Sequence, residues 1–476
     1  MQARDSVSAD RIQKLLLSTA IAGALQMGMT SSAGAQLFPA EIDLATVAAG
    51  SGFRLIGAAI GDEAGVSVGT AGDFNGDGLD DLLVGAWNAD PNGQLNAGRC
   101  YLIFGRADGL PDSLVLSQLD GQNGLIINGE TAGDQLCLSS KVAGDINDDG
   151  ISDIILGALL SDISGEDSGR GYVVFGTETP LLNPFSVSNI NGLNGVAFNG
   201  VASGDQAGRS VSGAGDVNGD GIDDFIIGAD RADPGGNTSA GASYVVFGSD
   251  SGLPNPFALS ALNGLNGFIL NGIEAESRLG RPVSAAGDIN GDGIDDLVVA
   301  AHTASVGADE QAGRSYVIYG RDTGFPNPFD LATIDGVNGV VLNGESANDL
   351  SGASVSAAGD VNGDGVDDLI IGAPFASANG QTSAGRSYVV FGSTGGLVHP
   401  FELSSINGFN GFVMYGESQG DFSGYAVSAA GDINGDGIDD VLIGAPTADP
   451  GGIADAGRTY VVFGRSDQPP NPLSLS

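Results

Sequence analysis

One acidic block recurs along the chain at an almost constant spacing. It begins with an aspartate in every copy: Asp73, Asp145, Asp216, Asp288, Asp360 and Asp432. Successive copies therefore start 72, 71, 72, 72 and 72 residues apart. A fixed period of this length indicates one supersecondary unit that is copied along the chain and that cannot bury its apolar face alone. The fold must therefore be one in which six similar units stack against one another.

Each unit contains four short segments with the composition of β-strands. In the fifth copy, a small-residue segment at 353–358 precedes the acidic block, and an apolar run at 369–371 follows it. A polar, glycine-rich loop leads to a third strand at 386–391, and a fourth strand at 339–343 lies ahead of the block. Four short strands per repeat are typical of one propeller blade. The repeats therefore predict an all-β propeller with four-stranded blades and the acidic block in a strand-to-strand loop.

The two ends of the repeat array predict the number of blades and a way of closing the ring. A segment at 52–57 matches the fourth strand of a unit, whereas the last unit ends after its third strand at 460–463. We expect the N-terminal segment to complete the last blade, which would leave no open sheet edge. Residues 36–476 hold about six units, so we expect six blades, with seven as the alternative.

The N-terminal region has the features of a secretory signal. Basic residues precede an uncharged apolar run at 15–29, and small residues at 33–35 offer a cleavage site. We therefore expect residues 1–35 to be a signal peptide and residues 36–476 to be the propeller domain of a secreted, extracellular or cell-surface protein. An uncleaved membrane anchor is the alternative, and no later stretch of the mature chain is apolar and long enough to span a bilayer.

The net charge restricts the classes of partner. The chain carries a formal charge of −42 at pH 7, and a negative field of this size repels phosphate backbones and anionic lipid surfaces. Nucleic acid is therefore excluded as an expected partner. Cations are the natural counterpart, and the acidic residues are clustered in the repeated block.

The acidic block has the donor pattern of a calcium-binding loop. It follows Asp-x-Asn-x-Asp-Gly-x-x-Asp, which in the fifth copy gives side-chain oxygens from Asp360, Asn362, Asp364 and Asp368. Position 7, Val366 in this copy, could turn its backbone carbonyl inward, and the glycine at position 6 permits a sharp turn. All of these donors are hard oxygens, which suit calcium better than magnesium or zinc. The sequence therefore predicts Ca²⁺ at about six sites.

Positions 1, 3, 5 and 9 are aspartate or asparagine in every copy. A single copy could be an acidic turn that binds nothing, but six copies in phase favour a metal site. A helical EF-hand is excluded because these loops run directly into a strand. The predicted metal ligands, at positions 1, 3, 5, 7 and 9, are Asp73, Asn75, Asp77, Leu79, Asp81, Asp145, Asn147, Asp149, Ile151, Asp153, Asp216, Asn218, Asp220, Ile222, Asp224, Asp288, Asn290, Asp292, Ile294, Asp296, Asp360, Asn362, Asp364, Val366, Asp368, Asp432, Asn434, Asp436, Ile438 and Asp440.

The repeat resembles the FG-GAP repeat of integrin α-subunit propellers. The resemblance rests on the acidic loop, on Gly-Ala-Pro at 372–374 and 444–446, and on a closing Phe-Gly strand, and it covers about residues 40–476. It implies a propeller whose hairpin loops hold calcium and a role in cell adhesion or extracellular ligand binding. The sequence departs from the integrin pattern, which has seven blades with metal in only some of them, and Gly-Ala-Pro is intact in only two copies.

Two functional hypotheses follow. The first is a calcium-stabilised adhesion module, not an enzyme, that binds an extracellular protein or glycan. The second is a secreted propeller hydrolase or lyase acting on extracellular polymers. Ser67 lies in a nucleophile-like string but aligns with an ordinary strand position, and His302 and His399 stand in different repeats, so we predict no catalytic residue. The ligand and the oligomeric state stay open.

The only two cysteines, Cys100 and Cys137, are too few for a disulfide framework. Export would permit a disulfide, but the two residues replace serine and glycine at unrelated repeat positions. Two buried thiols are the favoured interpretation, and pairing stays open.

Some positions vary between the copies and others do not. Trp87 is the only tryptophan, and we expect it to pack locally, with a surface binding anchor as the alternative. The variable loops at 86–97 and 301–312 are predicted to carry binding specificity. An arginine before the third strand is expected to form a structural salt bridge with a loop carboxylate, with a ligand-binding ring as the alternative, in five copies: Arg99, Arg170, Arg314, Arg386 and Arg458.

Overall fold

A computed structural model describes residues 52–467 and 469–475 of the chain. Nearly all of them belong to one compact unit, which comprises residues 42–433 and 437–476. Residues 434–436 are grouped instead with residues 1–41, and the predicted signal peptide lies outside the described residues. No helix within the described residues is long and apolar enough to cross a membrane.

The large unit is all-β and repeats one pattern of strands, as predicted. The first strands are β2 (Ser67–Gly72), β7 (Leu136–Gly144), β12 (Ser210–Gly215), β17 (Val283–Gly287), β21 (Ser354–Gly359) and β26 (Ala426–Gly431). The second strands are β3 (Asp81–Ala86), β8 (Asp153–Ala158), β13 (Asp224–Ala229), β18 (Asp296–Ala301), β22 (Asp368–Ala373) and β27 (Asp440–Ala445). The third strands are β4 (Arg99–Ile103), β9 (Arg170–Val174), β14 (Ala242–Val246), β19 (Arg314–Ile318), β23 (Arg386–Val390) and β28 (Arg458–Val462).

Strands of the fourth type and shorter elements follow. The fourth strands are β1 (Arg54–Ile56), β6 (Gly124–Asn128), β11 (Gly195–Asn199), β16 (Gly267–Asn271), β20 (Gly339–Asn343) and β25 (Gly411–Tyr415). Short fifth strands, which the sequence did not indicate, are β5 (Ser113–Val115), β10 (Phe185–Ser186), β15 (Phe257–Ala258), β24 (Phe401–Glu402) and β29 (Leu473–Ser474). Within the described residues, β1 of the fourth type pairs only with β5. Single 3₁₀ turns lie at η2 (Pro91–Gly93), η3 (Leu116–Gln118), η4 (Val187–Asn189), η5 (Pro234–Gly236), η6 (Leu259–Ala261), η7 (Leu331–Thr333), η8 (Leu403–Ser405) and η9 (Pro450–Gly452).

The strands pair as blades. In the sheet of the fifth blade, the strand order is β21-β22-β23-β25-β29, and the first four strands pair in antiparallel fashion. Ile371 of β22 lies opposite Val355 of β21 and Tyr388 of β23. The second strand β22 is buried along its whole length, which explains why its sequence is a continuous apolar run rather than an alternating one. β29 joins β25 in parallel, and β10, β15 and β24 join the fourth strands of other blades in the same way, so these four strands tie neighbouring blades together.

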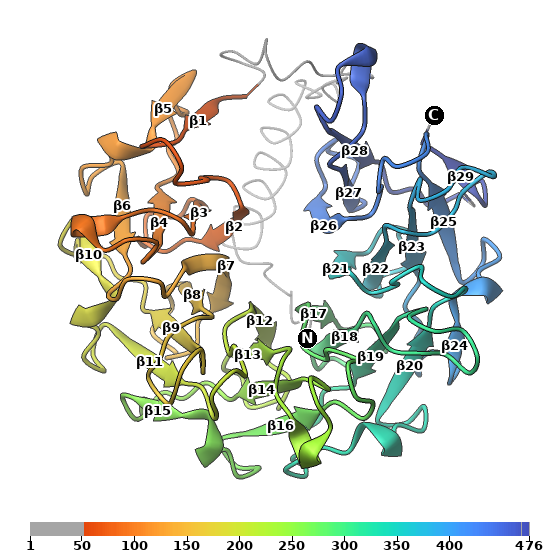
Figure 1. The fold of residues 1–476 in the computed structure, drawn as a ribbon, viewed down its shortest axis with the longest axis horizontal. Helices are drawn as coiled ribbons and strands as arrows, with labels where there is room; N and C mark the ends of the chain where they lie inside the picture. Colours follow the sequence, from red (N-terminus) through yellow and green to blue (C-terminus); the bar gives the residue numbers. More distant parts are fainter. Residues whose placement is uncertain (1–51, 468, 476) are drawn as a thin grey trace, which may run out of the picture. The chain divides into compact units, whose positions relative to one another are not determined.

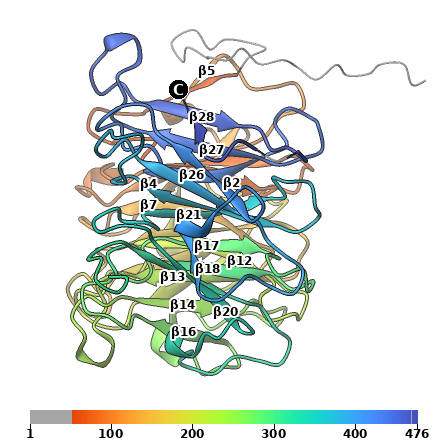
Figure 2. The same ribbon diagram turned by 90° about the vertical axis from the view of Figure 1, so that its right-hand side faces the viewer.

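The six blades are arranged around a common centre, which confirms the predicted propeller (Figure 1). The first strands β2, β7, β12, β17, β21 and β26 lie nearest the centre. Viewed from the side, the sheets follow one another in chain order from β12 to β26 (Figure 2). The core consists of apolar clusters between neighbouring blades, such as the one that joins Val298 and Val317 of the fourth blade to Leu369 and Ile371 of the fifth.

The junctions between blades are close. A Cβ atom on Gly372 would collide with the backbone carbonyl of Gly424 in the next blade, so the glycine of the repeated Gly-Ala pair permits this approach. The same contact recurs at other junctions, between Gly228 and the carbonyl of Gly280, for example. Small residues at these positions therefore fix how each blade sits on its neighbour.

The predicted closure of the ring by the N-terminal strand is wrong in this structure. β1 pairs in parallel with β5, and among the described residues the last sheet contains β26, β27 and β28 only (Figure 1). Val68 of the first blade is 62% exposed and Val461 of the last blade 44% exposed, so these two end faces are not buried against each other. The reason lies in the pairing, because β1 lies beside β5 as β6 lies beside β10, so β1 takes the place of a fourth strand ahead of the first blade instead of adding to β28.

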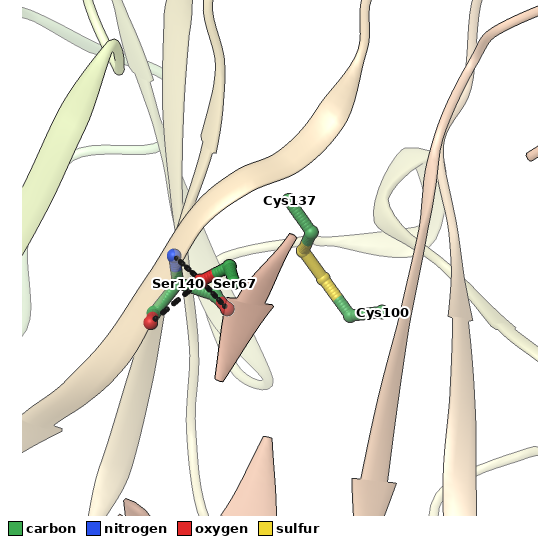
Figure 3. The surroundings of a disulfide bond; sticks show 4 residues. All are labelled: Ser67, Cys100, Cys137 and Ser140. Atoms are coloured by element: carbon green, nitrogen blue, oxygen red, sulfur yellow. Dashed lines mark hydrogen bonds between the residues drawn. A yellow bond between two sulfur atoms is a disulfide. The ribbon is translucent and has the colours of Figure 1, made fainter. Parts of the chain in front are cut away.

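A disulfide links Cys100 of β4 to Cys137 of β7, which corrects the favoured interpretation of two separate thiols (Figure 3). The Cα atoms are 5.7 Å apart. The equivalent residues at a later junction are Ser243 and Gly280, where a Cβ on the glycine would lie 2.8 Å from the serine Oγ. The two repeat positions are therefore neighbours across a junction, although they are far apart within one repeat, and the disulfide joins the first two blades.

Candidate metal loops

The acidic loops connect the first and second strands of the blades, as predicted, and the first loop shows their geometry. Both carboxylate oxygens of Asp73 accept hydrogen bonds from backbone amides inside the loop, from Asp77 at 3.0 Å and from Gly78 at 2.8 Å. Asn75 Oδ1 accepts a further bond from the Asp77 amide at 2.9 Å, and Asp77 Oδ1 accepts one from Leu79 at 3.0 Å. The side chains at positions 1, 3 and 5 thus curl the backbone into a tight acidic turn.

The aspartate at position 9 is buried rather than exposed at the loop. Asp368 is fully buried, its Oδ2 accepts from the amide of Val361 at 3.0 Å, and its Oδ1 accepts from Gly392 at 2.8 Å. Gly392 closes the third strand, so this carboxylate ties the loop to the Phe-Gly end of the blade. The same pair of bonds is made by the five equivalents: Asp81, Asp153, Asp224, Asp296 and Asp440.

Burial changes the acidity of these carboxyl groups. It raises the pKa of Asp81 to about 6 and the pKa of Asp153, Asp296 and Asp368 to about 8, although the two backbone bonds oppose the shift. The carboxylates at positions 1 and 5 raise the pKa further through like-charge repulsion. A cation in the loop would favour the ionised form of all these groups.

The aspartate at position 8 has a role that the sequence analysis missed. Asp295 Oδ2 accepts a hydrogen bond at 3.0 Å from the amide of Asp216, which is position 1 of the loop in the preceding blade. Asp223, Asp367 and Asp439 make the same bond at distances of 2.8 to 3.0 Å. Adjacent loops are therefore linked. The sequence does contain a signal for this role, because position 8 is aspartate in five of the six copies.

The donor chemistry of the loops fits a hard cation. All side chains at positions 1, 3, 5 and 9 offer oxygen, and an oxygen that accepts one amide hydrogen keeps a second lone pair for a cation. In the fifth loop, the side-chain nitrogen of Asn362 donates to Asp368 Oδ1 at 3.4 Å, which links positions 3 and 9. Within residues 52–467 and 469–475, no three Asp, Glu, His or Cys side chains gather as a metal centre. The described parts of the loops thus offer oxygen donors without a pre-formed cage of carboxylates.

The sixth loop repeats this geometry where its residues belong to the large unit. Asp432 Oδ2 accepts from the amide of Gly437 at 2.8 Å, as Asp73 does from Gly78. Asn434 and Asp436 fall in the smaller unit.

The residues considered for catalysis are engaged elsewhere. Ser67 Oγ lies 3.1 Å from Ser140 Oγ, beside the disulfide (Figure 3). His302 is buried with Nδ1 2.9 Å from the carbonyl of Arg281, and His399 Nδ1 accepts from the Val341 amide at 3.4 Å. These three side chains lie in different contacts and do not form one site.

The recurring arginines form structural contacts, as expected, although two of them bind amides instead of carboxylates. Arg170 pairs with Glu130 at 2.6 Å, Arg458 pairs with Glu417 at 2.5 Å, and Arg386 pairs with Glu345. Arg99 and Arg314 donate instead to Asn128 and Asn343, at 2.8 and 3.1 Å.

Trp87 is partly buried and donates to Glu63 Oε2 at 2.7 Å. This contact agrees with local packing of the indole ring.

Comparison with known proteins identifies the repeat. Phosphatidylinositol-glycan-specific phospholipase D from Bos taurus is 36% identical over 37% of this chain and 19% of its own length. Integrin alpha-5 from Xenopus laevis is 29% identical over 50% of this chain and 20% of its own length. Integrin alpha pat-2 from Caenorhabditis elegans is 30% identical over 48% of this chain and 17% of its own length. The chain thus spans about a fifth of the length of these relatives.

The family model described as the FG-GAP repeat matches one segment in each of five blades. The matched residues are 64–103, 207–246, 282–318, 351–390 and 423–462. The second blade, which carries Lys141 and Ser152 at variant positions, lies outside these ranges. The chain is therefore a β-propeller that contains FG-GAP repeats in five of its blades, and part of it is similar to integrin α subunits and to phosphatidylinositol-glycan-specific phospholipase D.

Proposed function

We propose that the chain is an extracellular calcium-binding propeller that acts as a cell-adhesion or protein- or glycan-binding module. The observation that carries the proposal is the repetition of an oxygen-only acidic loop at the same end of the first strand in all six blades. One such turn could serve the backbone alone, but six in phase concentrate negative charge that a divalent cation would offset.

The chemistry of a bound calcium ion would be structural. In the fifth loop, Asp360, Asn362, Asp364 and Asp368 would offer side-chain oxygens, and Val366 would offer its carbonyl. A calcium ion supplies positive charge that offsets the repulsion between these carboxylates. The chain's own residues hold the loop shape, because Asp360 accepts amide hydrogens from Asp364 and Gly365.

The binding role rests on the kinship with integrin α subunits and on the loops that vary between blades. A hydrolase or lyase is the second candidate, since a relative is named as a phospholipase D. The binding module is preferred because Ser67 contacts the hydroxyl of Ser140 and not a histidine.

The test is a binding assay run together with an activity screen. Purified residues 36–476 are immobilised and offered to cells and to a glycan array, with calcium and with excess chelator, and polysaccharide and phosphodiester substrates are incubated in parallel. We expect binding that calcium supports and no turnover. Turnover that one point mutation in a single blade abolishes would replace the module with an enzyme, and failure to bind any cell, protein or glycan would refute the proposal.

A further inference from the structure

Four arginines meet at the junction between the third and fourth blades. Arg209 directly precedes β12, and Arg281 lies two residues before β17. The starts of these two strands are tied together, because the amide of Val283 donates to Ser210 Oγ at 3.1 Å. Arg278 Nη1 approaches Asp230 Oδ2 at 3.8 Å across the junction, and the fourth arginine, at position 231, follows that aspartate.

This cluster is unusual in a chain that has 17 basic and 59 acidic residues. Asp230 is 1% exposed, and no other carboxylate of the described residues forms an ion pair with any of the four guanidinium groups. Arg209 is partly buried, and its pKa is lowered by burial and by the charge of Arg281. His302 adds no charge, because burial and the neighbouring Arg281 lower its pKa to about 4. The cluster therefore keeps an excess of positive charge.

The cluster is also asymmetric within the ring, as a binding site requires. Arginine occupies the position seven residues before the first loop aspartate only in the third and fourth blades, as the six equivalents show: Val66, Leu138, Arg209, Arg281, Ala353 and Tyr425. The position lies at the opposite end of the first strand from the acidic loop. Six strand residues separate the two ends in β12, which is roughly 20 Å. This distance exceeds the Debye length of about 8 Å at physiological salt, so the acidic loops do not cancel the charge of the cluster.

We propose that Arg209, Arg231, Arg278 and Arg281 form an oxyanion site that binds the carboxylate or sulfate groups of an acidic polysaccharide. Guanidinium groups bind such oxyanions through paired hydrogen bonds. Groups spread over two blades suit a polymer with several charges, because several of its oxyanions can pair with separate guanidinium groups at once and this local attraction can outweigh the repulsion from the net charge of −42. This inference rests on the proposed binding function and names its ligand class.

The proposal is tested by titrating labelled oligogalacturonate, a heparin oligosaccharide and a neutral oligosaccharide into residues 36–476, in calcium at low and physiological salt. We expect at least one acidic probe to bind and the R209M/R281M double variant to weaken that binding at least tenfold. The matched control is R106M/R465M, which removes two exposed arginines that pair with Asp108 and Asp467, and we expect less than a twofold change. Melting curves verify that all variants are folded.

A substitution with the opposite effect separates binding from structure. Asp230→Asn removes the carboxylate that competes for Arg278, so we expect it to tighten binding of the acidic probe severalfold. A purely structural role of the cluster would make this variant bind more weakly. The proposal is overturned if neither acidic probe binds, or if the control variant weakens binding as much as the double variant does. It is also overturned if polyglutamate binds through these arginines while neither acidic oligosaccharide does. A chain that still binds cells or neutral glycans in that case would retain the proposed function.

Discussion

The aspartate at position 9 shows how one side chain can organise a blade. Asp368 reaches the amide of Val361 in its own loop and the amide of Gly392 at the end of the third strand. A buried carboxylate with two backbone donors is a strong anchor, and its loss would leave two buried amides without partners. Position 9 thus connects the acidic loop to the Phe-Gly strand end, which explains why both features recur together.

The position-8 bond between blades can be tested with a matched pair of variants. We expect Asp295→Ala to lower the free energy of unfolding by about 1–3 kcal/mol, because the Asp216 amide loses its acceptor at a half-buried junction. Asp80 is the position-8 aspartate of the first blade, and its side chain is exposed. Asp80→Ala should therefore change the free energy of unfolding by no more than about 0.5 kcal/mol. Urea denaturation measures both, and equal losses in the two variants would contradict the role of this bond.

The raised pKa values predict a pH dependence. Asp153, Asp296 and Asp368 hold their protons up to about pH 8 in the folded chain, but only up to about pH 4 when unfolded. Their contribution to stability is therefore complete below the unfolded pKa and is lost as the pH rises through the folded pKa. In excess chelator, the urea concentration at the unfolding midpoint should therefore decrease as the pH is raised from about 5 to about 8.5. A midpoint that rises over this range would show that the groups are ionised in the folded protein.

At the scale of elements, most strands could be predicted from the sequence because their signals are local. The run at 369–371 and the segment at 339–343 each carry an apolar pattern bounded by glycine, and the structure places β22 and β20 there. The short fifth strands could not be predicted, since a two-residue strand such as β24 gains its pairing only from the neighbouring blade. Partners across a junction depend on how the blades stack, so neither the Cys100–Cys137 bond nor the failure of β1 to reach β28 follows from one repeat.

The disulfide links the first two blades at a junction whose equivalents between later blades form without a disulfide. Later copies carry serine and glycine at these positions, so we expect the C100S/C137G double variant to fold. The disulfide closes a loop of 37 residues, and its removal should cost about 4 kcal/mol of unfolding free energy. A reducing agent should lower the melting temperature of the wild type to that of the variant and leave the variant unchanged. An unchanged wild-type melting curve would mean that the disulfide contributes nothing.

At the scale of the whole molecule, negative charge and stability are coupled through the loops. Six acidic loops repel their own carboxylates, and the net charge of −42 adds to this repulsion. If each loop binds calcium with a dissociation constant of about 0.1 mM in about 2 mM calcium, mass action supplies roughly 1.8 kcal/mol per site. Six independent sites would supply on the order of 11 kcal/mol, which is comparable with the stability of a typical domain.

The most direct test is a melting curve of residues 36–476 recorded in about 2 mM calcium and again in excess chelator, together with a calorimetric titration of the metal-free chain. We expect the chelator to lower the melting temperature by more than about ten degrees, and the titration to show about six binding events per chain. Identical melting curves and no heat of calcium binding would contradict the calcium-dependent propeller.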